Sequence, residues 1–124
     1  MNTQPETNSR RVIRIGTRGS PLALAQAEEF KTCLLAGHAD LDHDNVKIVP
    51  IRTAGDRSQH NVTDDVGGKA VFVKEIEEAL LARTVDMAVH SMKDMETQLR
   101  EGLAVPCFLP RADPRDAFVS VKVK

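Results

Sequence analysis

The stretch that decides the fold runs from residue 11 to residue 35, with the sequence RVIRIGTRGSPLALAQAEEFKTCLL. Its first part, Arg11–Thr17, alternates apolar and polar side chains, which predicts a strand. Ser20 and Pro21 then match a helix cap followed by proline at the first helical position. The apolar spacing that follows predicts a helix, and Gly37 is a typical helix end.

The rest of the chain continues the alternation of strand and helix. Val46–Thr53 predicts a second strand, in which Pro50 indicates an edge position or a bulge. Apolar residues within Phe72–Leu80 recur at helical spacing, and Asp86–His90 is typical of a short buried strand. The apolar run Leu103–Leu109 predicts a further strand. This order predicts an α/β fold in which helices flank a mostly parallel sheet.

The composition of the 124-residue chain excludes several classes of partner. The formal net charge is -1, so there is no global field that would favour nucleic acid or an anionic membrane. With four Phe and no Trp or Tyr, base-stacking platforms are not expected. The apolar runs are too short to span a bilayer, and the polar start lacks the apolar core of a signal peptide. We therefore expect a cytoplasmic protein without nucleic-acid or membrane partners, whose residues 1–11 form a disordered tail.

The cysteines and histidines give no sign of a metal site. Cys33 and Cys107 lie far apart and belong to no Cys-x-x-Cys pair, so two buried, reduced thiols are favoured. Cys, His and carboxylate residues do not stand at metal-ligand spacing on a common helix face. His90 ends an apolar strand, which favours a partly buried histidine over a catalytic base.

Three polar clusters follow predicted strands, in the loops that lead onward: Thr17–Ser20, Thr53–Lys69 and His90–Asp94. Parallel sheets place ligands at the carboxyl ends of their strands. In the first cluster, backbone N–H groups at the helix start attract anions, and Arg18 can hold a carboxylate through two parallel hydrogen bonds. A capped helix with a solvated Arg18 explains that cluster equally well. A ligand-binding site is favoured because all three clusters are expected at the same edge of the sheet.

The other two clusters add groups for binding and chemistry. Gly67, Gly68 and Lys69 lack the Gly-x-x-x-x-Gly-Lys-Ser/Thr spacing of a nucleotide loop, so we expect a mobile charged lid, with a solvated turn as the alternative. In the third cluster, Asp94 can stabilise developing positive charge or move protons, and Lys93 can bind acids. An exposed Lys–Asp pair of little energetic value is the alternative.

The clusters occur in an order that resembles the porphobilinogen deaminase (hydroxymethylbilane synthase) family. The resemblance covers residues 12–120, nearly the whole chain. Its five matching segments are Arg14–Gln26, Thr53–Asp56, Gly67–Glu77, Asp86–Asp94 and Asp113–Phe118.

The resemblance implies a transferase of tetrapyrrole and haem biosynthesis. The family condenses four porphobilinogen molecules into hydroxymethylbilane with release of ammonia, starting from a dipyrromethane cofactor attached to a cysteine. Its members are mostly monomeric. Carried over by motif, Asp94 is the expected catalytic residue, contacting pyrrole nitrogens and stabilising a cationic azafulvene-like intermediate. The residues expected to bind cofactor or substrate are Arg18, Ser20, Lys93, Thr17 and Ser91. Those expected on or beside the mobile loop are Gly67, Gly68, Lys69 and Phe72.

The resemblance also sets expectations about domains. Family members have three domains, and here residues 12–109 match the first, with 110–124 as the crossover segment toward a second. The first domain is half of a periplasmic-binding-protein-like (type II) cleft. Neither Cys33 nor Cys107 lies in the motif of the cofactor cysteine, and the later substrate-binding arginines are missing. We therefore expect the 124 residues alone to be inactive and prone to self-association.

Local departures from the family pattern are few. Glu96 stands where a proline is usual, Ala70 and Val71 replace the commoner Gly-Leu, and Asp65 lies where some relatives carry lysine. Two alternatives stay open. One is a binding-only domain for a small anionic ligand, and the other is a non-functional truncated product.

Overall fold

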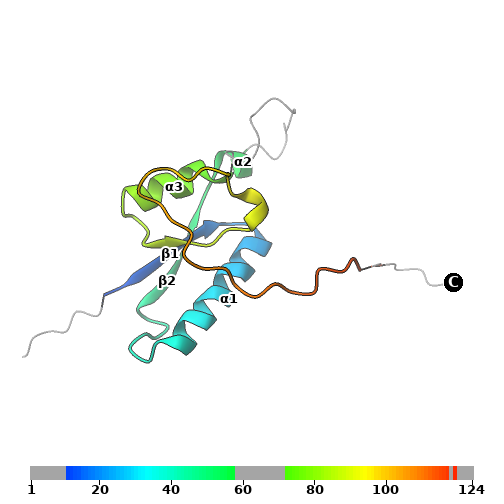
Figure 1. The fold of residues 1–124 in the computed structure, drawn as a ribbon. Coiled ribbons are helices and arrows are strands. Elements are labelled where there is room, and N and C mark those ends of the chain that lie inside the picture. The colour runs from blue at the N-terminus through cyan, green and yellow to red at the C-terminus, as the bar shows by residue number, and fades with distance from the viewer. Residues whose placement is uncertain (1–10, 58–71, 118, 120–124) are drawn as a thin grey trace, which may run out of the picture.

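A computed structural model describes residues 11–57, 72–117 and 119 of the chain. Strands and helices alternate along it, and the tail 1–10 lies outside the described residues (Figure 1). In chain order the elements are β1 (Ile13–Arg18), α1 (Pro21–Gly37), β2 (Val46–Ile51), α2 (Ala54–Arg57), α3 (Lys74–Leu81), β3 (Met87–Ala88) and the 3-10 helix η2 (Met92–Asp94).

The sheet is parallel and has β1 at its centre, in the order β2-β1-β3. Ile15 of β1 pairs with Ile48 of β2 and with Met87 of β3. Figure 1 shows α1 on one side of this sheet and α3 on the other. The predicted α/β fold with a parallel sheet between helices is confirmed. Pro50 lies in β2, an edge strand of the described sheet, where a missing backbone donor is tolerated.

Helix α1 begins where the sequence predicts. The Ser20 hydroxyl accepts a hydrogen bond from the backbone N–H of Ala23 at 3.3 Å, which satisfies a donor that the first helical turn leaves free. Pro21 stands at the first helical position, where its lack of an N–H costs nothing. The helix ends at Gly37, and His38 returns to extended backbone. The cap therefore places the helix start directly after the end of β1.

The core is small and centres on the middle of β1. Gly16 lets neighbouring elements approach this strand closely, because an added Cβ would lie 3.1 Å from Val85 and 3.2 Å from Ile51. Helix α3 contributes its apolar side to the same core. The buried apolar residues are Ile15, Ala27, Val46, Val73, Ile76 and Val85.

An ion pair joins β1 to the segment that precedes β3. The backbone N–H and the Nε of Arg14 both donate to Oδ2 of Asp86, at 2.8 and 3.1 Å. Hydrogen bonds from Arg14 hold the pKa of Asp86 below its ordinary value, although partial burial opposes them. Because the two residues are 72 positions apart, this pair aligns β3 beside the central strand.

Three expectations about apolar segments were wrong. Leu103–Leu109 forms no strand; it is an extended segment without a strand partner among the described residues, and Phe108 is 68% exposed. An apolar run becomes a strand only when a neighbouring strand satisfies its backbone groups. Cys107 lies on that extended segment and is exposed. Cys33 is also exposed, because it lies on the outer side of α1.

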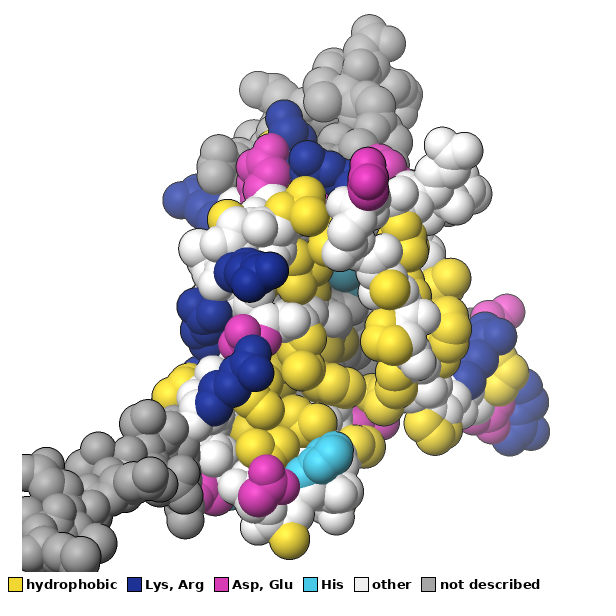
Figure 2. Space-filling model, turned by 60° about the vertical axis from the view of Figure 1, so that its left-hand side comes forward, with side chains coloured by type: hydrophobic (Ala, Val, Ile, Leu, Met, Phe, Trp, Pro, Cys, Tyr) yellow, Lys and Arg dark blue, Asp and Glu magenta, His cyan; other side chains and the backbone are white. Residues whose placement is uncertain are grey.

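The surface carries large apolar side chains that the described fold does not cover. Among the described residues before 119, the most exposed large apolar side chains are Leu22, Met92 and Phe108. Figure 2 shows a face on which apolar side chains gather in and around a hollow. Within the described ranges, no helix has the length and apolar character needed to cross a membrane.

Replacing Ile76 tests the core. Ile76→Ala is expected to lower the free energy of unfolding by about 2–5 kcal/mol, because the side chain is fully buried and its loss leaves a cavity. Leu81→Ala on the same helix is the matched control, since Leu81 is 41% exposed and surface changes usually cost below about 0.5 kcal/mol. Urea denaturation of both variants measures the difference. Equal losses would contradict the placement of the core.

Candidate functional site

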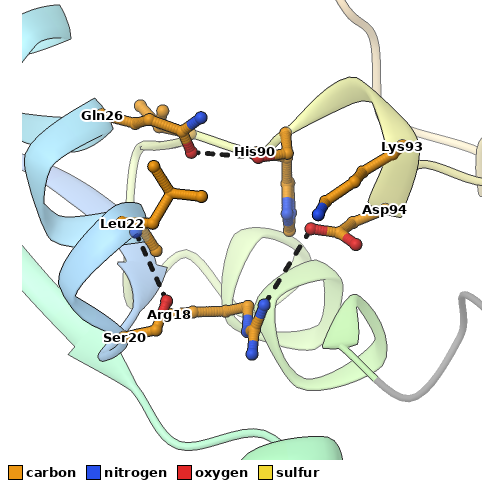
Figure 3. Close-up of a pocket in the computed structure, with 10 residues that line it drawn as sticks. Arg18, Ser20, Leu22, Gln26, His90, Lys93 and Asp94 are labelled. Atoms are coloured by element: carbon orange, nitrogen blue, oxygen red, sulfur yellow. Dashed lines mark hydrogen bonds and ion pairs between the residues drawn. The ribbon is translucent and has the colours of Figure 1, made fainter. Parts of the chain in front are cut away.

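A pocket lies where the first and third clusters meet, at the carboxyl ends of β1 and β3 (Figure 3). The start of α1 forms one wall, and the loop into η2 forms the other. Parallel pairing brings these segments together although they are about 70 residues apart, so the predicted edge is where the pocket forms. The lining residues are Arg18, Ser20, Leu22, Ala23, Gln26, Val89, His90, Ser91, Lys93 and Asp94.

Arg18, the last residue of β1, contacts residues from three other segments of the chain. Its Nη2 donates to Oδ1 of Asp56 at 2.8 Å, and its Nη1 lies 4.0 Å from Oδ2 of Asp94. The guanidinium carbon lies 3.9 Å from the centre of the Phe72 ring, within cation–π distance. The side chain is 21% exposed. Arg18 is therefore a held cation rather than a solvated one.

Asp94 and Lys93 belong to η2 and face the same space. Figure 3 shows both side chains directed toward His90 and Arg18. The Asp94 side chain is 17% exposed, whereas Lys93 is exposed overall. The pocket thus presents one carboxylate between two cations. This arrangement can bind acidic groups at its rim and hold positive charge beside Asp94.

His90 is partly buried, as the sequence predicted, and lines the pocket. Burial lowers the pKa of its imidazole; nearby Asp94 raises this pKa, and Arg18 lowers it further. The net effect is a pKa below the ordinary value of 6.5. At neutral pH the imidazole is therefore uncharged and adds no positive charge to a site that already holds Arg18 and Lys93.

The three hydroxyl residues of the prediction have different positions. Ser20 lines the pocket while it caps α1. Ser91 also lines it, but its hydroxyl donates to Oε1 of Gln26 at 3.1 Å and makes no capping hydrogen bond to η2. Thr17 is fully buried, and its hydroxyl donates to the carbonyl of Ala23 at 3.3 Å. The Thr17 side chain points into the core beneath α1 rather than into the pocket.

Two residues in or beside the pocket were assigned no function from the sequence alone. Gln26 lies one helical turn beyond Leu22 on α1, so both face the pocket. Asp56 pairs with Arg18. The sequence feature that could have identified Asp56 is its Thr-x-x-Asp spacing from Thr53, which is typical of a helix capping box. Of the predicted loop residues, Phe72 is described and contacts Arg18. Gly67, Gly68 and Lys69 lie outside the described residues.

The fold and pocket define a parallel α/β domain with a charged site at its strand ends. Residues 13–124 match the family model for the porphobilinogen deaminase, dipyromethane cofactor binding domain. This match covers most of the chain, so the chain belongs to the porphobilinogen deaminase family, whose members act in tetrapyrrole biosynthesis. The domain that it matches is the one that binds the dipyrromethane cofactor.

Curated relatives agree with this assignment. Porphobilinogen deaminase of Paracoccus denitrificans is 56% identical over 110 residues, covering 89% of this chain and 35% of the relative. The protein of Nitrobacter winogradskyi is 55% identical over 120 residues, covering 97% and 37%. The chloroplastic protein of Pisum sativum is 51% identical over 119 residues, covering 95% and 32%. The chain thus spans about a third of the length of these relatives. Because some relatives are chloroplastic, the cytoplasmic location stays a prediction.

The pKa of His90 reports on the charges around it. In Asp94→Asn we expect this pKa to fall further, because the carboxylate that raises it is removed. In Arg18→Gln we expect it to rise, because a cation that lowers it is removed. Following the imidazole protons by NMR as a function of pH measures both shifts. Asp44→Asn, an exposed change on a remote loop, is the control. Shifts of the opposite sign would contradict the arrangement of the pocket.

Proposed function

We propose that this chain supplies the first-domain part of a hydroxymethylbilane synthase active site, in which porphobilinogen molecules are condensed with release of ammonia. The observation that carries the proposal is the meeting of Arg18, Lys93 and Asp94 in one pocket. Porphobilinogen bears two acidic side chains, which suit the two cations. Positive charge develops on the pyrrole as ammonia leaves, which suits the carboxylate.

The chemistry of the lining residues fits a dipyrromethane as well as the substrate. Arg18 has a buried Nε without a hydrogen-bond partner in the described part of the chain, and its Nη1 has only the distant contact to Asp94. Lys93 and Ser20 add donors for acid groups. When bound, the cofactor supplies the pyrrole carbon from which the chain of pyrroles is extended. Neither cysteine lines the pocket, so covalent attachment requires a residue outside this set.

The charge of each pocket residue determines its proposed role in binding or in stabilising the intermediate. Arg18 and Lys93 bind the acid side chains and so orient the pyrrole over Asp94. Asp94 accepts a hydrogen bond from the pyrrole N–H and stabilises the cation that forms when ammonia departs. The uncharged His90 avoids repelling that cation. The neighbouring helix start of α1 contributes a favourable field for the acid groups.

A chimaera tests the proposal. This chain replaces the matching 110 residues of the Paracoccus denitrificans enzyme, and tetrapyrrole product is followed by absorbance after acid oxidation. We expect turnover of porphobilinogen, and Asp94→Asn is expected to lower kcat by about 100-fold or more, because it removes a preorganised charge. Arg18→Gln is expected mainly to raise KM. Asp44→Asn is the matched control.

The 124-residue chain alone is expected to give no product from porphobilinogen, because neither Cys33 nor Cys107 reaches the pocket. Sustained turnover by the isolated chain would overturn this part of the proposal. An inactive chimaera that still binds porphobilinogen in calorimetry would favour the alternative, a domain that only binds a small anionic ligand.

A further inference from the structure

The segment Thr53–Asp56 makes Asp56 a rigid anion. The Thr53 hydroxyl donates to Oδ2 of Asp56 at 2.7 Å and accepts from the Asp56 backbone N–H at 3.3 Å. The Thr53 N–H also donates to Oδ2, at 3.3 Å, which completes a reciprocal capping box at the start of α2. Thr53 is fully buried, so the carboxylate is anchored to the protein interior.

The second oxygen of Asp56 holds Arg18. Nη2 of Arg18 lies 2.8 Å from Oδ1, and the two side chains are 21% and 15% exposed. Burial by itself raises the pKa of Asp56, but the hydrogen bonds from Arg18 and Thr53 outweigh it and keep the pKa below the ordinary value. Asp56 is therefore ionised at neutral pH, and its attraction for Arg18 acts in a partly dry environment where screening is weak.

The face of the same guanidinium is covered by Phe72, 3.9 Å away. Gly55 makes this contact possible, because a Cβ at position 55 would lie 2.3 Å from the Phe72 ring. Asp56 thus restrains the edge of the Arg18 guanidinium, while Phe72 restrains its face. Nε is buried, so Nη1 is the nitrogen left facing the pocket, and it lies 4.0 Å from Oδ2 of Asp94.

Two carboxylates therefore compete for Arg18, and the distances show that Asp56 has the stronger hold. If Asp56 released it, the flexible side chain would be drawn to Asp94, because an unpaired cation in this setting is costly. An Arg18–Asp94 pair at hydrogen-bond distance would neutralise the carboxylate that a cationic pyrrole needs. It would also occupy the donors that an acid side chain needs.

We propose that Asp56 is a positioning residue, which holds Arg18 back from Asp94 so that both remain available to a ligand. This role rests on the proposed function of the pocket for its effect on turnover, but the position of Arg18 is a property of the chain itself. With this role, the Thr53–Asp56 motif does more than cap a four-residue helix: it also fixes the position of Arg18.

The first test follows Arg18 in the 124-residue chain by NMR. Ring currents from Phe72 shift the side-chain protons of Arg18 upfield, and in Asp56→Asn we expect these resonances to move toward ordinary values. Asp113→Asn is the control: it also removes the carboxylate partner of an arginine, Arg115, but it is exposed and does not line the pocket. Arg18 resonances that are the same in Asp56→Asn and wild type would overturn the proposal.

The second test measures kcat and KM in the chimaera. Asp56→Asn is expected to lower kcat by about tenfold, because Arg18 is displaced and Asp94 is no longer free for the pyrrole, with a smaller change in KM. Asp56→Glu keeps the charge and is expected to recover part of kcat, which a purely structural role would not predict. An equal loss in Asp56→Glu and Asp56→Asn would overturn the proposal.

The two tests separate this inference from the proposed function. A wild-type chimaera without turnover would overturn the proposed function, and the NMR test would still decide where Arg18 lies. If Asp56→Asn does not fold, Thr53→Val replaces it, because it removes the hydroxyl that anchors Asp56 and keeps both charges. The same displacement of Arg18 is expected, to a smaller extent, and its absence would overturn the proposal.

Discussion

Parallel pairing of the central strand β1 with both of its neighbours is the constraint on which the rest of this structure depends. Parallel strands end at the same edge of their sheet, so the residues that follow β1, β2 and β3 must come together. The cap on Ser20 turns the chain into α1 at that edge, and the pair between Arg14 and Asp86 aligns β3 from the opposite end. The pocket is a consequence of this alignment, because its two walls are about 70 residues apart in the sequence.

Charge balance around Arg18 is the second constraint, and it links the fold to the chemistry. A partly buried guanidinium costs several kcal/mol unless partners replace the water that it loses. Asp56 and the face of Phe72 supply those partners without filling the pocket, while Asp94 stays at a distance. The site therefore keeps Arg18 and Asp94 near each other without a hydrogen bond between them, which suits the proposed binding of an acidic substrate that passes through a cationic intermediate.

Most regular elements could be predicted because each has a local cause. The Ser20 cap, the alternation in β1 and the helical spacing before Leu81 depend on residues a few positions apart. The prediction of a strand at Leu103–Leu109 was wrong, because a strand forms only beside a neighbouring strand, and an apolar sequence does not ensure that such a neighbour exists. The prediction that the cysteines are buried was wrong for a related reason, since Cys33 lies on an exposed side of α1 and Cys107 on an exposed segment.

By itself, the sequence determined the class of fold, the sheet edge that carries the site and the family, because these follow from local periodicity and from ordered motifs. It also named Arg18, Lys93 and Asp94 as neighbours through their places after two strands. Only the tertiary structure decided which carboxylate holds Arg18, that Thr17 points into the core and that Ser91 bonds to Gln26. Those outcomes depend on distances of a few ångströms between segments far apart in the chain, and packing sets such distances where periodicity does not.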